Sequence, residues 1–496
     1  MAERASNLRP VPRQTLRLLL VLAALALVAS GCGSKSSSSG LDSALRFVPK
    51  DAPIVVAIDT NPDGDQWQQV DKLLGKFPFG GQVKQQLKNS FNSRSRVNYD
   101  TDIKPLLGND LVFAVTSVPG AQAPSLVVAW KVKDEGAAKK LVQKTALKAP
   151  SIEGAEVYRT SGGATFAFKD GTLVFSPTQA ELVAALKRGG GSDHLTEQEF
   201  GDKLGSLDKK SLVRVTGNAK ALYASQLGQS VARLPLVRSQ GDFGVTLRAA
   251  PDGIEFAFEN KTDGTVQDKD LPLPTGAQSV PVVRRAGEIG IGLRDPARVI
   301  TFYESAFKAV PAIYRRFATQ KAKATKVLGV NIDRDLIGQL TGNAAVSVSL
   351  TGDFAVRADL RDPAAAEATL KKAAPGLLKL TKGNVSLTKP KNGKGFYTLG
   401  RANGKQIAFG VVGKSFVAAS DAARAAQFAG QSPSIVPGAK GSLVIASDAR
   451  ALANAIAARQ GQGTAAQLVT GALGDLIGWV EYERTGVTGN LKLFIR

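Results

Sequence analysis

The chain has 496 residues, with 64 lysines and arginines against 42 aspartates and glutamates and a net charge of +22. Hydrophobic residues make up 43% of it, which in a chain of this length is enough to build a sizeable core. The chain has a single cysteine, which excludes an intrachain disulfide. Because it also has a single histidine, a zinc site built from His and Cys ligands is excluded too. Aromatic residues form only 6% of the chain and do not alternate with basic ones, so we expect no nucleic-acid partner.

The first 31 residues have the pattern of a bacterial secretory signal. Four arginines precede 12 consecutive apolar residues at positions 18–29, and small residues follow them. As a helix the apolar run would be about 18 Å long, which is too short for a hydrocarbon core of about 30 Å. The sequence therefore predicts that residues 1–31 are a lipoprotein signal peptide that is removed, rather than a transmembrane anchor.

Cys32 follows this segment directly and is the predicted lipid attachment site. Residues 29–32 (Ala-Ser-Gly-Cys) resemble the lipobox of bacterial lipoproteins, with Ala29 where leucine is more common. Acyl chains on this cysteine would hold the protein on the membrane, because each buried methylene contributes about 0.8 kcal/mol. The alternative is a chance cysteine after an ordinary signal cleavage site. Residues 32–40 are rich in serine and glycine and predict a flexible tether. We expect the protein on the outer face of the cytoplasmic membrane, in the cell envelope.

The segment Asp59–Asp65 follows an apolar run at 54–58 that is typical of a strand. It matches the start of a calcium loop, with oxygen-bearing side chains at its first, third and fifth positions and glycine at its sixth. The twelfth position, where such a loop has glutamate, is Val70. We therefore interpret the segment as a strand-to-helix turn, with Asp63 or Asp65 capping the helix that follows, and predict no metal site. A weak calcium site is the alternative.

His194 is the only histidine, and it follows three glycines at positions 189–191. A catalytic triad needs its base held rigidly by a partner, which a glycine-flanked loop does not favour. The sequence contains neither a Gly-x-Ser-x-Gly elbow nor a phosphate-binding Gly-x-x-x-x-Gly-Lys-Ser/Thr loop. We assign no catalytic residue and no cofactor, although a nucleophile built from serine and lysine stays open.

An internal repeat organises the rest of the chain. Residues 102–109 are echoed by residues 335–343, and four further echoes follow in the same order. The sequence therefore predicts a first repeat at 41–262, a linker at 263–276 that is rich in Asp, Thr, Gly and Pro, and a second repeat at 277–496.

Each repeat has the signals of an α+β fold. Pairs and meanders of short strand patterns, such as 158–175 and 396–418, alternate with single helical patterns. Asp295-Pro296 and Asp362-Pro363 have the pattern of an N-cap followed by proline at the first helical position. We predict two tandem copies of a module with a mainly antiparallel sheet covered by helices. A parallel, doubly wound sheet is the weaker alternative.

Basic residues cluster at 315–326 and again at 371–394. The simplest interpretation is a solvated helix face followed by a lysine-rich loop. The alternative is a surface that faces an anionic envelope polymer or lipid.

The start of the predicted first repeat resembles a known family. Residues 47–53 (Phe-Val-Pro-Lys-Asp-Ala-Pro), a strand ending at Asp59, and residues 66–78 with their Leu-Leu and Phe-Pro pairs carry the resemblance. They are similar to an uncharacterised group of bacterial, largely actinobacterial, envelope lipoproteins known as domain of unknown function 3352. The resemblance implies the same signal, tether and external domain. The family has no assigned activity, so the resemblance implies no functional residues.

These observations favour a membrane-anchored extracytoplasmic lipoprotein that binds an envelope ligand or a protein partner and is not an enzyme. Its expected partners are the membrane, through lipidated Cys32, and an anionic envelope polymer or lipid. The sequence does not identify a protein partner. Two alternatives stay open, namely a metal-independent cell-envelope hydrolase and a structural spacer or assembly protein of the envelope.

Overall fold

A computed structural model describes residues 39–78, 80–82, 85, 89, 97–117, 125–223, 234–381, 385–390, 395–400, 404–459 and 470–496. The predicted signal peptide, Cys32 and residues 33–38 of the predicted tether lie outside these residues. The chain divides into two compact units. Unit 1 comprises Met1–Gln226 and Asp242–Pro251, and unit 2 comprises Leu227–Gly241 and Asp252–Arg496. No helix in the described part of the chain is both long and apolar enough to cross a bilayer.

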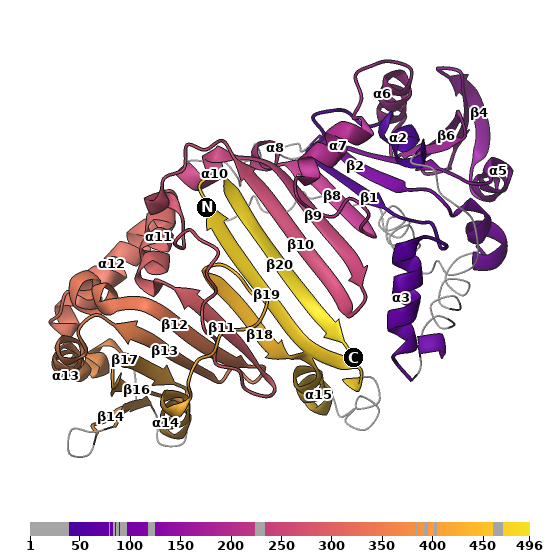
Figure 1. Ribbon diagram of the computed structural model, residues 1–496. Helices are drawn as coiled ribbons and strands as arrows, with labels where there is room; N and C mark the ends of the chain where they lie inside the picture. Colours follow the sequence, from indigo (N-terminus) through magenta and orange to yellow (C-terminus); the bar gives the residue numbers. More distant parts are fainter. Residues whose placement is uncertain are drawn as a thin grey trace. The chain divides into compact units, whose positions relative to one another are not determined.

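The sheet of unit 1 has the strand order β9–β8–β1–β2–β3–β7–β6–β5–β4, with antiparallel neighbours throughout (Figure 1). The strand β1 therefore lies between its successor β2 and the much later β8. The strands are β1 (Ile54–Ile58), β2 (Leu111–Ser117), β3 (Ser125–Lys131), β4 (Leu147–Ile152), β5 (Ala155–Arg159), β6 (Thr165–Lys169), β7 (Thr172–Ser176), β8 (Val213–Asn218) and β9 (Gln240–Ala250).

Helices cover the sheet of unit 1 and enclose two hydrophobic cores. One core joins the sheet to α2, α6 and α7 through fully buried residues such as Leu45, Leu186 and Phe200. The second core gathers Trp67 of α3 and Tyr99 of η1 with residues of β3 and α5. The helices are α2 (Ser39–Leu45), α3 (Asp65–Gly75), η1 (Tyr99–Ile103), η2 (Lys104–Leu106), α5 (Glu135–Gln143), α6 (Gln179–Gly189), α7 (Glu197–Leu204) and α8 (Ala219–Tyr223).

The sheet of unit 2 has the order β10–β20–β19–β18–β11–β12–β13–β17–β16–β15–β14 and is also antiparallel (Figure 1). Here β11 lies between its successor β12 and the much later β18. The strands are β10 (Gly253–Thr262), β11 (Glu288–Arg294), β12 (Leu340–Ser349), β13 (Phe354–Leu360), β14 (Ser386–Thr388), β15 (Tyr397–Gly400), β16 (Gln406–Val412), β17 (Ser415–Ala419), β18 (Leu443–Asp448), β19 (Leu473–Glu483) and β20 (Gly486–Ile495).

The helices of unit 2 either contact the sheet or pack on one another. The helix α14 contacts β13, β16 and β17 and buries Ala425 and Phe428 there. The helices α11, α12 and α13 form a layer in which α12 contacts both of the others. The helices are α10 (Pro235–Ser239), η3 (Asp268–Asp270), α11 (Pro296–Lys308), α12 (Pro311–Leu328), η4 (Ile332–Leu336), η5 (Ile337–Gln339), α13 (Pro363–Leu380), α14 (Ala422–Gly430) and α15 (Ala449–Arg459).

Two specific contacts hold the layer of α11, α12 and α13 together. A Cβ atom at Gly376 of α13 would lie 2.4 Å from the carbonyl oxygen of Val327, so only glycine lets α13 approach α12 this closely. The Lys321 ammonium of α12 lies 2.6 Å from a carboxylate oxygen of Glu304 on α11 and also pairs with Asp333. The three helices are therefore fixed against one another by close packing and by an ion pair.

The mixed helix-and-strand fold with a large antiparallel sheet is confirmed. The strand at 54–58 is present, and Asp295 and Asp362 cap α11 and α13 with proline in the first turn. The parallel alternative is wrong for the described residues. The strand β10 pairs with β20, so the break between the compact units falls at residues 251–252, one strand before the predicted repeat boundary at 262.

Candidate functional site

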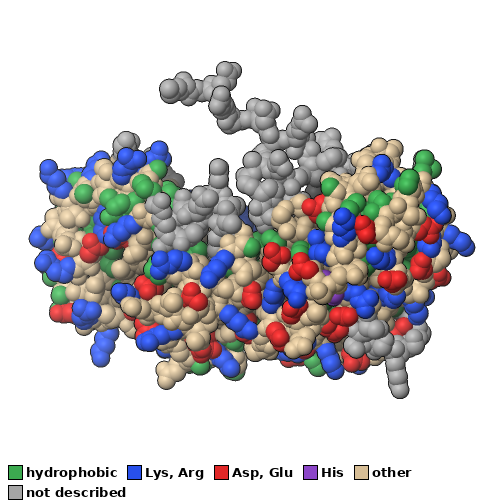
Figure 2. All heavy atoms as spheres, turned by 90° about the horizontal axis from the view of Figure 1, so that it is seen from above, with side chains coloured by type: hydrophobic (Ala, Val, Ile, Leu, Met, Phe, Trp, Pro, Cys, Tyr) green, Lys and Arg blue, Asp and Glu red, His purple; other side chains and the backbone are tan. Residues whose placement is uncertain are grey.

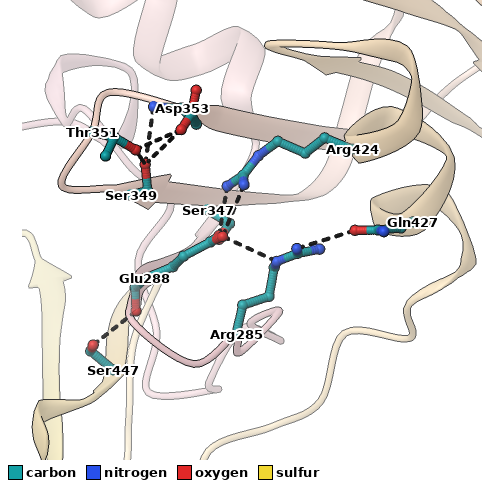
Figure 3. A network of polar contacts seen from close by, with 9 residues as sticks. All are labelled: Arg285, Glu288, Ser347, Ser349, Thr351, Asp353, Arg424, Gln427 and Ser447. Carbon is teal, nitrogen blue, oxygen red and sulfur yellow. Dashed lines mark hydrogen bonds and ion pairs between the residues drawn. The ribbon is translucent and has the colours of Figure 1, made fainter. Parts of the chain in front are cut away.

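A buried ion pair between Glu288 and Arg424 forms the centre of a polar network in unit 2 (Figure 3). Glu288 is the first residue of β11, and Arg424 lies in the first turn of α14, which begins there because Asp421 accepts a hydrogen bond from the Arg424 backbone N–H. The guanidinium donates two parallel hydrogen bonds to the carboxylate, of 2.9 Å to Oε1 and 2.6 Å to Oε2. Such a bidentate pair fixes direction as well as distance.

The Glu288 carboxylate is fully occupied by its neighbours. Besides Arg424, Arg285 Nε donates to Oε1 over 3.2 Å, and the buried Ser347 hydroxyl donates to Oε2. Burial raises the pKa of Glu288, but the hydrogen bonds from Arg424 and Ser347 outweigh it and hold the pKa below its usual value. The carboxylate therefore stays ionised at neutral pH and is suited to positioning the two arginines rather than to exchanging protons.

The network borders an open depression of about 700 Å³ on unit 2. Arg285 donates through a terminal nitrogen to Gln427 Oε1 over 3.3 Å, a contact that Figure 3 shows. The depression is lined by Arg284, Arg285, Ala286, Glu288, Ala426, Gln427, Gly430 and Gln431.

The charges around this depression leave a positive excess. Arg284 pairs with Asp475 over 2.5 Å, and Glu288 is shared by Arg285 and Arg424, so three guanidinium groups face two carboxylates. Terminal nitrogens of arginine in a fixed orientation suit carboxylate and phosphate groups. The buried Gln431 Oε1 has no hydrogen-bond partner among the described residues, which leaves an acceptor beside the arginines. The arrangement can hold an anionic group that also carries a hydrogen-bond donor.

A turn rich in hydroxyl groups joins β12 to β13 in the same view (Figure 3). The Ser349 hydroxyl accepts from the backbone N–H of Asp353, and Thr351 Oγ1 donates to the Asp353 carboxylate over 2.5 Å. The hydrogen bond from Thr351 is the main reason why the pKa of Asp353 lies below its usual value. These contacts close the hairpin on itself, so we interpret the turn as structural.

Among the described residues of unit 1, the positions that match Glu288, Ser347 and Arg424 hold no such pair. Matching the strand registers places Pro53 and Ala114 where unit 2 has Glu288 and Ser347. The third residue of α6 is Glu181, whereas the third residue of α14 is Arg424. Within the described parts of the two units the network is therefore found in unit 2 alone, and no pattern in the sequence predicted it. Glu288 and Arg424 lie 136 positions apart in the chain. A single sequence carries no signal that two residues so far apart form a pair.

The segment Asp59–Asp65 forms a turn that uses its oxygens internally. Asp59 Oδ1 accepts from the backbone N–H of Asn61 over 2.8 Å, and Asn61 Oδ1 accepts from that of Asp63 over 3.2 Å. Two of the side chains that a calcium loop would direct at a metal are thus bonded to the loop itself. No group of three or more His, Cys, Asp or Glu side chains within the described ranges could hold a metal ion. The predicted cap is wrong, because Gly64 is the N-cap of α3 and no side chain caps it.

Asp59 lies beside a second buried ion pair, between Asp110 and Arg214. Burial, with a smaller contribution from the neighbouring Asp110 carboxylate, raises the pKa of Asp59 to about 6 against the opposing effects of the Asn61 N–H and Arg214. Because Arg214 is hydrogen-bonded to Asp110, Asp59 has no hydrogen-bonded counter-ion of its own among the described residues.

The remaining sequence candidates do not join either cluster. His194 Nδ1 donates to the Gly191 carbonyl over 3.0 Å, a contact within its own loop. The first basic cluster lies on α12, and Lys371, Lys372 and Lys379 of the second cluster lie on α13. Cys32, the predicted lipid attachment site, lies outside the described residues, as do Lys382, Lys391 and Lys394.

Replacing Glu288→Gln is expected to lower the free energy of unfolding by about 3–5 kcal/mol, because the Arg424 charge stays buried without its counter-charge. Urea unfolding measures the change. The double variant Glu288→Gln, Arg424→Gln should recover part of the loss, since it removes the uncompensated charge. Equal stability of Glu288→Gln and the unmodified protein would contradict a stabilising role for the pair.

Replacing Asp59→Asn is expected to raise the free energy of unfolding at pH 7.5 by up to about 3 kcal/mol. The folded-state pKa of about 6 lies above the ordinary value of 3.8, so the contribution of Asp59 to stability is complete below pH 3.8 and is lost as the pH rises through 6. Asparagine keeps an acceptor for the Asn61 N–H and carries no charge. Urea unfolding at pH 7.5 and pH 4 should show the gain at the higher pH only, and Asp65→Asn, at an exposed position of the same loop, should show no such difference. A gain of equal size at both pH values would refute this explanation.

Comparisons with known proteins identify the family of the chain. Three crystal forms of a protein called TP0453 are similar to it in structure. Form III has a TM-score of 0.26 and 10% sequence identity and covers 45% of this chain and 81% of TP0453, and form I has the same TM-score and identity and covers 45% and 80%. Form IV has a TM-score of 0.25 and 9% identity and covers 44% of this chain and 79% of TP0453. No curated protein matches the chain significantly. The family profile described as "Protein of unknown function (DUF3352)" matches residues 15–373, which is more than half of the chain. The chain therefore belongs to the DUF3352 family.

Proposed function

We propose that this protein is a bacterial lipoprotein of the cell envelope, held on the outer face of the cytoplasmic membrane through lipidated Cys32. The charged start, the short apolar run at 18–29 and the lipobox-like residues 29–32 support this proposal. The tether at 32–40 would let the folded units stand away from the bilayer. The same signals are the basis for describing the protein as bacterial and extracytoplasmic.

We also propose that the two units are tandem copies of one module. Five sequence echoes in the same order support this, and so does the order of strand pairing. In unit 1 the central strand β1 pairs with β2 and β8, and in unit 2 the central strand β11 pairs with β12 and β18. The strands on the far side follow as β3–β7–β6–β5–β4 and β13–β17–β16–β15–β14. On this basis the copies have diverged in their charged residues while keeping one arrangement of strands.

Within this anchored protein, unit 2 binds an envelope ligand through an anionic group, either carboxylate or phosphate. The observation that carries this proposal is Arg285, which Glu288 and Gln427 hold in place at a depression with one positive charge in excess. Arginine held in this way loses little conformational freedom when it binds an anion. Glu288 has no free acceptor for a proton-transfer role, so the site favours binding over catalysis.

Replacing Cys32→Ser is expected to remove the mass of the acyl groups and to let a high-salt wash release the protein from the membrane fraction, because serine cannot carry the thioether-linked lipid and attachment by charge alone is screened by salt. Cell fractionation followed by intact-mass measurement checks this, since the lipidated protein should be heavier by the mass of its acyl groups. A Cys32→Ser protein that stays on the membrane through a high-salt wash and has no added mass would contradict the lipid anchor. It would leave the ligand proposal to be judged by its own experiment.

Replacing Arg285→Gln should abolish retention of the ligand, since Arg285 is the proposed contact with the anionic group. Glu288 keeps Arg424 and Ser347 as partners in this variant, so the fold should persist. Native mass spectrometry of protein purified from its own envelope should show a bound anionic molecule that is lost on denaturation and is absent from Arg285→Gln. The matched control is Arg334→Gln, because the Arg334 side chain is 79% exposed and lies outside the depression.

If the unmodified protein has the mass of the chain without a ligand, the proposal of a tightly bound ligand is overturned. The search would then turn to protein partners. A ligand retained equally by both variants would place its site elsewhere in the protein. The hydrolase alternative predicts a different result, which is covalent labelling of one serine by a fluorophosphonate or β-lactam probe.

A further inference from the structure

We propose that α12 and α13 of unit 2 form a docking surface for an anionic lipid bilayer and bind the phosphates of its headgroups. We call these two helices the basic helix pair. The proposal gives the membrane anchored at Cys32 a second contact with the protein, and in that respect it rests on the proposed lipoprotein function. It concerns a part of unit 2 that is separate from the depression at Arg285.

The basic helix pair is almost free of acidic residues. The 18 residues of α12 include no aspartate or glutamate, and those of α13 include only Glu367. Lys321, on the inner side of α12, is paired with Glu304 and Asp333. The exposed cations of the pair are Arg315, Arg316, Lys323, Lys326, Lys371, Lys372 and Lys379.

Close packing brings the cations of the two helices into one layer. Gly376 lets α13 approach the Val327–Leu328 backbone of α12 directly. At the same end of the contact, Lys372 Cε would lie 3.8 Å from a Cβ atom at Gly329, the residue that ends α12. Basic residues near an anionic membrane each contribute to binding, and their effects combine when they share one surface.

Apolar side chains are exposed among these cations. Ile313 on α12 is 49% exposed and Leu378 on α13 is 39% exposed. In Figure 2, blue Lys and Arg spheres lie around green hydrophobic spheres at the left end, where Figure 1 places α11 and α12. This combination suits the boundary between lipid headgroups and acyl chains, where cations meet phosphates and apolar side chains enter the outer acyl region.

The exposed apolar residues favour a bilayer over a soluble polyanion. A polymer of phosphate groups would be bound by charge alone and would gain nothing from Ile313 or Leu378. A bilayer offers both the charge and an apolar layer within reach of a helix that lies on its surface. A basic surface is a common second contribution to membrane attachment beside acyl chains.

Vesicle binding by the mature chain from residue 32 with Cys32→Ser tests the proposal without any contribution from an acyl chain. Co-sedimentation with vesicles of phosphatidylglycerol and phosphatidylcholine should show binding that falls as salt is added, and vesicles of phosphatidylcholine alone should bind weakly. Removing four cations of the basic helix pair, with Arg315→Gln, Lys323→Gln, Lys371→Gln and Lys379→Gln together, should weaken binding by roughly a hundredfold or more. Each basic residue near such a surface contributes about fivefold.

The matched control removes four exposed lysines of unit 1, with Lys133→Gln, Lys140→Gln, Lys187→Gln and Lys210→Gln together. It makes the same change in net charge and should bind nearly as well as the parent chain. Equal weakening of both variants would show that net charge alone is responsible and would overturn the proposal. So would unchanged binding of the helix-pair variant, or binding of soluble polyglycerol phosphate as tightly as vesicles. Because Cys32 is absent from every arm, a failed lipid anchor would not produce any of these results.

Discussion

The position of the central strand in each unit, β1 in unit 1 and β11 in unit 2, is the constraint on which the rest of the structure depends. Ile58 of β1 pairs with Leu111 on one side and with Val213 on the other, and Leu293 of β11 pairs with Ala344 and Leu443. Each unit must therefore close a long loop before its central strand has both neighbours. Closing so long a loop costs entropy that only the completed sheet and its cores repay, which makes the whole unit cooperative and its folding slow.

A central strand has neighbours on both edges and layers on both faces, so its charged groups lie at its ends. Asp59 directly follows β1, and Glu288 begins β11. The two carboxylates have opposite pKa shifts because they have different partners. Glu288 receives hydrogen bonds from two guanidinium groups and a hydroxyl, which outweigh its burial. Asp59 is buried while Arg214 is engaged by Asp110, so desolvation prevails there. The hydrogen-bonding partner of each carboxylate, rather than its position in the fold, therefore decides whether the ionised or the protonated form is favoured.

The features that local patterns determine could be predicted from the sequence, and those that depend on distant pairs could not. The strand at 54–58, the caps at Asp295 and Asp362 and the antiparallel meanders follow from periodicity and from proline placement within a few residues. Glu288 and Arg424 have no local signature, and the predicted repeat gave no guide to them, because unit 1 has Pro53 and Glu181 at the matching positions. In the segment Asp59–Asp65 the residue types were compatible with calcium, but the backbone N–H groups of the turn bind the same oxygens.

The distribution of arginine and lysine separates the two charged regions of unit 2 by their chemistry. Arginine occupies the buried network, where planar bidentate geometry stabilises Glu288, whereas lysine predominates on the exposed surface of the basic helix pair. Like charges one turn apart, such as Lys323 and Lys326, destabilise a helix by a few tenths of a kcal/mol for each pair. An acidic residue at any of several exposed positions of α12 would relieve that repulsion, and none is present. The stability of the helix therefore does not explain the composition of α12, whereas the proposed contact with an anionic bilayer would.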